Sequence, residues 1–204
     1  MGKVIFAGGK AGMDKPIALP SGYTKLAYIQ SSGTQYINTG FNPNQDTRVV
    51  MDIQATGASG TYFTFGARQA NTSNSFCFFY YEGWSADYQT NAQRKTLEGL
   101  AFNDLLRIDF NKTVCSANGK TVNFTEATFQ APVAMALLAV NTNGEVANML
   151  AAKLYGCKIY DNGTLVRDFV PCISNTGAIG LYDLVGKQFY ANAGTGTFTG
   201  SEVA

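Results

Sequence analysis

Asparagine followed by glycine occurs three times in the second half of this chain, at 118–119, 143–144 and 162–163. Both residue types tolerate positive φ, which a two-residue type I′ turn between antiparallel strands requires at both central positions. Each pair has apolar residues on at least one side. The three pairs therefore predict three β-hairpins, and they constrain the fold more than any other feature of the sequence.

The turn positions also predict which residues face each other across a hairpin, because side chains on a strand alternate between its two faces. The expected pairs are Ala117 with Lys120, Cys115 with Val122, Thr113 with Phe124, Tyr160 with Leu165, and Ile159 with Val166. Of these residues, Cys115, Val122 and Phe124 should share the core face.

The whole chain from residue 19 onward has a strand-like texture, with short apolar and β-branched runs separated by Asn, Gly, Ser and Thr. No helical pattern lasts three turns, and the nearest approach, Thr96 to Leu106, is weakened by Gly99. The other expected strands are Arg48–Gln54, Tyr62–Ala67, Phe76–Tyr81, Leu105–Phe110, Val133–Val140, Leu154–Tyr160, Ala178–Leu184, Gln188–Tyr190 and Gly196–Thr199. Many short strands with frequent turns are typical of a β-sandwich or barrel.

Composition excludes several classes of function. The chain has 15 Lys and Arg against 14 Asp and Glu, so it lacks the basic surplus with which nucleic-acid binders displace counterions from phosphate. Histidine is absent, which removes the commonest general base and excludes Ser-His-Asp and Cys-His enzymes. A chain of 204 residues can bury a sufficient core without a metal or a disulfide, so no cofactor is expected.

The four cysteines, Cys77, Cys115, Cys157 and Cys172, are widely spaced and contain no CxxC pair. A disulfide framework is typical of shorter secreted chains. The favoured interpretation is therefore four reduced thiols buried as small hydrophobic side chains.

The first 18 residues differ from the rest, being rich in Gly, Ala and Lys without sustained alternation. They predict an arm or attachment segment over 1–18, followed by one sandwich domain over 19–204. Val4, Ile5 and Phe6 form a lone strand-competent run that could add to the sheet edge of a partner, the alternative being a disordered terminus. The run is too short for a signal peptide or a membrane span, so we expect synthesis in the cytoplasm and no membrane insertion.

The two ends of the domain resemble a known family. "LPSGYTKLAYIQSSGTQYINTGF" and "KIYDNGTLVRDFVPCISNTGAIGLYDLVGKQFYANAGTGTFTG" together resemble the concanavalin A-like (laminin-G-like) jelly-roll domains of phage and prophage structural proteins and of gut-bacterial surface proteins. The likeness spans about Leu19 to Gly200 and implies an all-β, antiparallel jelly-roll sandwich with its first and last strands side by side. Tyr28–Gln30 and Tyr36–Asn38 would be the opening strand segments, bent at 31–33.

The resemblance implies a non-catalytic phage virion surface protein, tail-associated or capsid-decorating, that presents a lectin-like sandwich to host or mucosal glycans. Its arm would contact other virion proteins, and the protein would form a homo-oligomer. A bacterial cell-surface adhesin or carbohydrate-binding module is the alternative. A glycoside hydrolase comes third, because the paired carboxylates that such enzymes of this fold place on one strand are absent from the sequence.

The stretch "FCFFYYEGWSADYQTNAQR" is the candidate ligand site, since it contains the only tryptophan and several polar residues in an expected loop. Lectin sites pair an aromatic ring with amides and charged groups that fix the sugar hydroxyls. The candidate ligand-binding residues are Trp84, Tyr81, Asp87, Tyr88, Asn91 and Arg94. The alternative is that Trp84 and one tyrosine cap the core or fill a subunit interface.

A second loop, "NPNQD", contains Asn42, Asn44 and Asp46 and could offer oxygen ligands to calcium. Asn and Asp also hydrogen-bond their own backbone in turns. The turn is the favoured interpretation, and no metal site is assigned.

Overall fold

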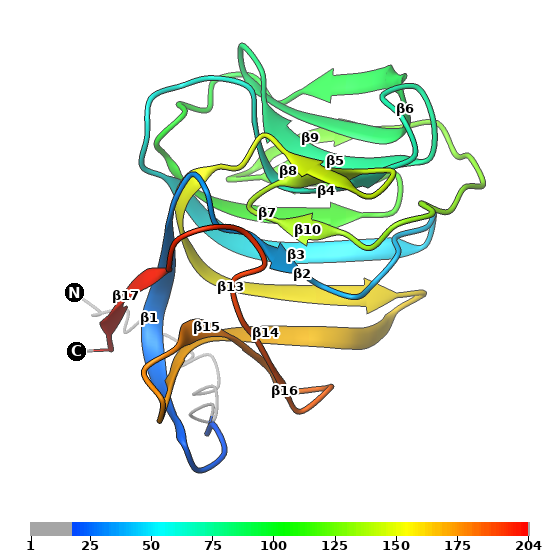
Figure 1. The fold of residues 1–204 in the computed structure, drawn as a ribbon. Coiled ribbons are helices and arrows are strands. Elements are labelled where there is room, and N and C mark those ends of the chain that lie inside the picture. The colour runs from blue at the N-terminus through cyan, green and yellow to red at the C-terminus, as the bar shows by residue number, and fades with distance from the viewer. Residues whose placement is uncertain (1–17, 204) are drawn as a thin grey trace, which may run out of the picture.

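Two β-sheets packed face to face make up the part of the chain that the computed structural model describes, residues 18–203 (Figure 1). The expected all-β antiparallel sandwich is confirmed. This part of the chain contains no helix, and Thr96–Leu106 forms the end of one strand, a loop and the start of the next. Within the same residues, no helix long and apolar enough to cross a membrane is found.

The larger sheet has ten strands in the order β16-β15-β14-β1-β13-β3-β7-β8-β9, with β17 beside β1. Their bounds are β1 Tyr23–Ser32, β3 Thr47–Ala55, β7 Leu105–Asn111, β8 Val114–Ala117, β9 Lys120–Asn123, β13 Ala151–Asp161, β14 Thr164–Ser174, β15 Ile179–Asp183, β16 Gln188–Tyr190 and β17 Thr199–Glu202.

The smaller sheet has seven strands, with β4 at its centre between β5 on one side and β10 and β11 on the other. Their bounds are β2 Ile37–Asn38, β4 Tyr62–Arg68, β5 Ser75–Tyr80, β6 Trp84–Thr96, β10 Ala136–Leu137, β11 Val140–Thr142 and β12 Glu145–Ala147. The expected single strand Val133–Val140 is wrong, because Leu138 has a φ of 67° and separates β10 from β11. β11 then runs parallel to β4.

The hairpin predictions are largely confirmed. All three Asn-Gly pairs have positive φ at both residues. Ala117 faces Lys120 and Cys115 faces Val122, the Phe124 amide donates to the Thr113 carbonyl at 2.8 Å, and Tyr160 faces Leu165. Ile159 faces Arg167 instead of Val166, because a β-bulge inserts one residue there and shifts the register.

The chain crosses from one sheet to the other at the expected bend. β1 belongs to the larger sheet and β2 to the smaller one, and Gly33 between them has a φ of 100°. At the other end of the chain, β17 lies antiparallel to β1, so the first and last strands are side by side as expected (Figure 1). The final strand runs Thr199–Glu202, a few residues later than the sequence predicts.

The main core lies between the sheets and includes Ile29, Met51, Phe65, Phe76 and Phe110. The four cysteines are free and buried, which confirms the interpretation as reduced thiols.

Candidate functional site

A second, smaller apolar cluster lies on the outer face of the smaller sheet. In β5, Phe76 and Phe78 point into the main core, so the alternating Cys77 and Phe79 point the other way. Phe79 stacks on Phe63 of β4 with ring centroids 4.8 Å apart. Gly66 leaves room for Cys77 in this cluster, because a Cβ at position 66 would lie only 2.9 Å from the Cys77 sulfur.

Arg94 covers one of these rings. Its guanidinium carbon lies 4.7 Å from the Phe79 ring centroid and 5.9 Å from that of Tyr81. Nε and one terminal nitrogen donate to the two carboxylate oxygens of Asp87 at 2.8 and 3.0 Å. These hydrogen bonds to Asp87 raise the pKa of Arg94, and the Asp87 side chain is fully buried.

The fold of β6 explains this pairing. Its chain doubles back near Gln89, which has a φ of 64°. The Leu97 amide donates to the Trp84 carbonyl at 2.8 Å, so the second half of β6 lies against the first half. Arg94 therefore reaches Asp87 from the returning half of the same element.

Arg68 covers the other ring, with its guanidinium carbon 5.2 Å from the Phe63 centroid. Nε donates to the Thr142 hydroxyl at 2.8 Å. Within residues 18–203 the Arg68 side chain makes no further hydrogen bond and no ion pair. Its two terminal nitrogens are therefore available to a ligand.

The two arginines line one pocket of about 280 Å³ on the outer face of the smaller sheet, which we call the outer-face pocket. Its lining residues are Thr61, Phe63, Arg68, Asn71, Phe79, Tyr81, Arg94 and Asn148. The buried phenylalanines lie at the bottom, whereas Tyr81 is 49% exposed. The Asn148 side chain is fixed by donating to the Thr61 carbonyl at 3.0 Å. The pocket thus combines an apolar base, an exposed aromatic ring and several polar donors.

Tyr81 and Arg94 are the two predicted site residues that line this pocket, and Asp87 lies beneath Arg94. The sequence reasoning missed Phe63, Arg68, Asn71, Phe79 and Asn148, together with Thr61. One sequence feature indicates the apolar base of the pocket. The unbroken apolar run 76–79 is typical of a strand covered on both faces, so Phe79 could have been placed on the outer face.

The prediction of Trp84 as an exposed ligand-binding residue is wrong. Trp84 is only 1% exposed, its ring stacks on Phe102 at 5.9 Å, and its Nε1 donates to the Ala101 carbonyl at 2.9 Å. The expected loop is a tight turn in which the Tyr81 amide donates to the Gly83 carbonyl. The chain therefore enters β6 at once, and its first side chain points into the core.

Tyr88 and Asn91 also lie outside the pocket. Tyr88 is buried against Phe110, Phe124 and Phe129, and its hydroxyl donates to the Gln45 carbonyl at 3.3 Å. Asn91 supports the pocket indirectly, because its amide donates to the carbonyl of Asn71, a lining residue.

A larger pocket of about 480 Å³ lies near the "NPNQD" loop. Asp46 at its edge forms an ion pair with Lys112 at 2.8 Å, and this hydrogen bond lowers the pKa of Asp46. The Asn44 side chain accepts a hydrogen bond from the Asp46 amide at 2.7 Å and donates another to Asp161. The first of these is the hydrogen bond of a turn, which was the favoured interpretation, and the second ties the loop to the end of β13. Over residues 18–203, no three Cys, Asp or Glu side chains gather as metal ligands.

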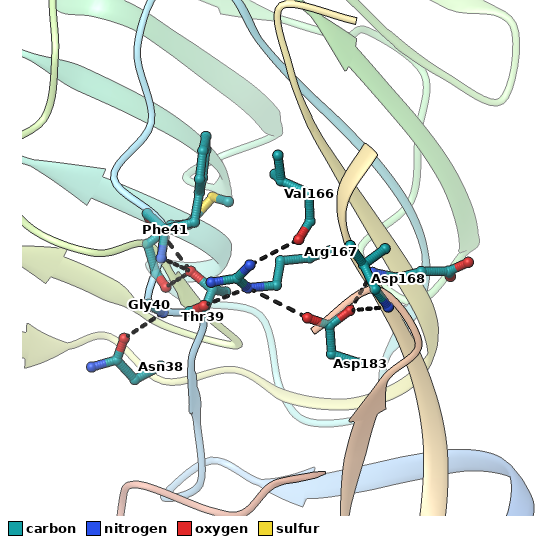
Figure 2. Close-up of polar contacts among 10 residues, drawn as sticks. Asn38, Thr39, Gly40, Phe41, Val166, Arg167, Asp168 and Asp183 are labelled. Atoms are coloured by element: carbon teal, nitrogen blue, oxygen red, sulfur yellow. Dashed lines mark hydrogen bonds and ion pairs between the residues drawn. The ribbon is translucent and has the colours of Figure 1, made fainter. Parts of the chain in front are cut away.

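Arg167 of β14 pairs with the buried Asp183 of β15 and also donates to the segment after β2, so it ties that segment to the larger sheet (Figure 2). The fully buried Asp183 lies 3.6 Å from Arg167 Nε and accepts a hydrogen bond from the Asp168 amide at 2.9 Å. Arg167 also donates to the carbonyls of Thr39 and Val166 at 3.0 and 2.8 Å. All these interactions are internal to the fold, so the cluster is structural.

The predicted arm residues Val4, Ile5 and Phe6 lie outside the described residues. A comparison with models of known protein families matches none of them, and a comparison with curated protein sequences finds no similar protein.

Proposed function

We propose that this protein is a non-catalytic carbohydrate-binding β-sandwich displayed on the surface of a phage virion. The observation that supports sugar binding is the outer-face pocket, in which the exposed Tyr81 ring stands beside free donors of Arg68 and Arg94. One face of a pyranose carries C–H groups that pack on an aromatic ring. Its hydroxyls need fixed polar partners, which the asparagines and arginines of the pocket supply.

Binding without hydrolysis is supported by the chemistry of the same pocket. Glycoside hydrolysis requires two carboxyl groups flanking the scissile bond. The described residues that line the pocket include neither Asp nor Glu. The nearby carboxylate of Asp87 is buried, and both of its oxygens accept hydrogen bonds from Arg94.

The virion setting rests on the resemblance of the two end motifs to phage structural proteins. In this proposal the arm, with Val4, Ile5 and Phe6, attaches the protein to other virion proteins or to further copies of the chain. The sandwich then presents the outer face of its smaller sheet to host or mucosal glycans.

The test is binding of the full chain to an array of immobilised glycans, compared with Tyr81→Ala. We expect the wild type to bind a defined set of glycans, and the variant to lose about 1–2 kcal/mol of binding free energy, by analogy with bases that stack on aromatic rings. Leu105→Ala is the matched control, since Leu105 is a 55% exposed apolar residue on the larger sheet. Absence of any glycan binding, or equal binding by Tyr81→Ala, would contradict the proposal.

A further inference from the structure

The two arginines of the outer-face pocket differ in how their charges are compensated. Arg94 is neutralised by the buried carboxylate of Asp87, to which it donates twice. Arg68 has no acidic partner within residues 18–203. The lining of the pocket therefore carries one uncompensated positive charge.

Arg68 is also held in a fixed geometry. Its Nε is occupied by the Thr142 hydroxyl, and its guanidinium lies over the Phe63 ring. The pair of terminal nitrogens that remains presents parallel N–H groups, which match the two oxygens of a carboxylate. Because the side chain is already ordered by these two contacts, little further entropy is lost when an anion binds.

We propose that the outer-face pocket selects sugars that carry a carboxylate, namely the uronic or nonulosonic acid residues of acidic glycans. This inference rests on the proposed function and specifies its ligand class. Arg68 receives the carboxylate, the Tyr81 ring packs on the apolar face of the pyranose, and Asn148 holds a hydroxyl. A single uncompensated arginine suits a single negative charge. The chain as a whole has a net charge of only +1, so it lacks the basic surplus that is typical of proteins that bind polyanions.

Two matched pairs of sugars test the selectivity of the full chain by titration. Methyl glucuronide and methyl glucoside differ only in a carboxylate against a hydroxymethyl group. The methyl glycoside of N-acetylneuraminic acid and its methyl ester differ only at the carboxyl group, which is charged in the acid and neutral and methylated in the ester. In at least one pair we expect the acid to bind about tenfold to a hundredfold more tightly, as for a hydrogen bond to a charged group. The pair that responds identifies the uronic or the nonulosonic source.

Variants of Arg68 test whether this residue produces the preference for the acid. Arg68→Gln should abolish the preference for the acid, so that the acid and the neutral sugar of the responding pair bind equally tightly. Arg68→Lys retains the charge but loses the paired N–H groups, so it should keep only part of the preference. Arg107→Gln is the matched control, because Arg107 is a 78% exposed arginine on the larger sheet. Circular dichroism melting of each variant verifies that the fold is retained.

The outcomes distinguish this inference from the proposed function. Equal binding of acid and neutral sugar, still weakened by Tyr81→Ala, overturns the acid selectivity and leaves carbohydrate binding intact. Binding of inorganic sulfate as tight as that of the sugar acids overturns the selectivity too, because the sugar ring then contributes nothing. A wild-type protein that binds no glycan overturns both.

Discussion

At the scale of single residues, one buried carboxylate organises the candidate site. Asp87 takes both hydrogen bonds from Arg94 and so fixes the guanidinium over Phe79. Removing the partner of a buried charge typically costs about 3–5 kcal/mol, because the remaining charge stays desolvated. The pairing of Asp87 with Arg94 thus serves stability and the shape of the pocket together.

The buried thiols predict how stability depends on pH. Burial raises the pKa of Cys77 from 9.0 to about 12 and that of Cys172 to about 11. At a pH between the pKa of a thiol in the unfolded chain and its pKa in the folded chain, the unfolded chain releases a proton that the folded chain retains. The free energy of unfolding should therefore be unaffected by these thiols well below pH 9.0, the pKa of the unfolded thiol, and fall as the pH rises through that value, approaching about 1.4 kcal/mol per pH unit for each thiol.

Urea unfolding at about pH 8 and about pH 10, in the presence of a reductant, measures this fall. Cys77→Ala removes one of the titrating groups and should show a shallower decrease than the wild type. An identical decrease in both proteins would mean that Cys77 does not contribute.

At the scale of secondary-structure elements, the success of sequence reasoning depended on local turns. The β8–β9 register was predictable because a type I′ turn at Asn118 fixes which residues face each other. The fold of β6 was not predictable, because its second half is polar and pairs with the first half only through the backbone turn near Gln89. Trp84 was accordingly placed on a loop, although it begins this element.

The same limit applies to the candidate site. Tyr81 and Arg94 were predicted because they lie close together in one stretch of sequence. Arg68 and Asn148 were missed because they reach the pocket from β4 and from the segment after β12. Such proximity arises from pairing between distant segments, which no local pattern encodes.

Replacing Trp84 tests the element that begins with it. Trp84→Ala should lower the free energy of unfolding by about 3–5 kcal/mol, since it removes a large buried ring and leaves a cavity beside Phe102. Urea unfolding of Tyr81→Ala provides the comparison, because that ring is half exposed and should contribute much less. Equal losses in the two variants would be inconsistent with the position of Trp84 in the core.

At the scale of the whole molecule, every strand that the structure describes lies within residues 23–202. The pairings of β1 with β13, β14 and β17 all begin at or after Tyr23. Of the first 18 residues, the structure describes only Ala18, which is exposed. The domain should therefore fold without this segment.

Deleting residues 1–18 should leave a soluble protein with an unchanged far-ultraviolet spectrum, because every strand that the structure describes is retained. If the arm attaches the protein to a partner, the deletion should also reduce the oligomer seen by light scattering, or prevent incorporation into the virion. Assembly of the truncated protein as efficient as that of the full chain would show that the arm has no such role.

The antiparallel arrangement of β1 and β17 determines how the domain responds to mechanical force. Leu26 lies opposite Glu202, and Gln30 lies opposite Thr199, so the N-terminal end of β1 lies beside the C-terminal end of β17. A pull applied at residues 18 and 203 therefore loads these hydrogen bonds one after another, as in opening a zipper, and not all at once, as in shear. Under tension the terminal pair should yield first, while the smaller sheet and its outer-face pocket stay folded.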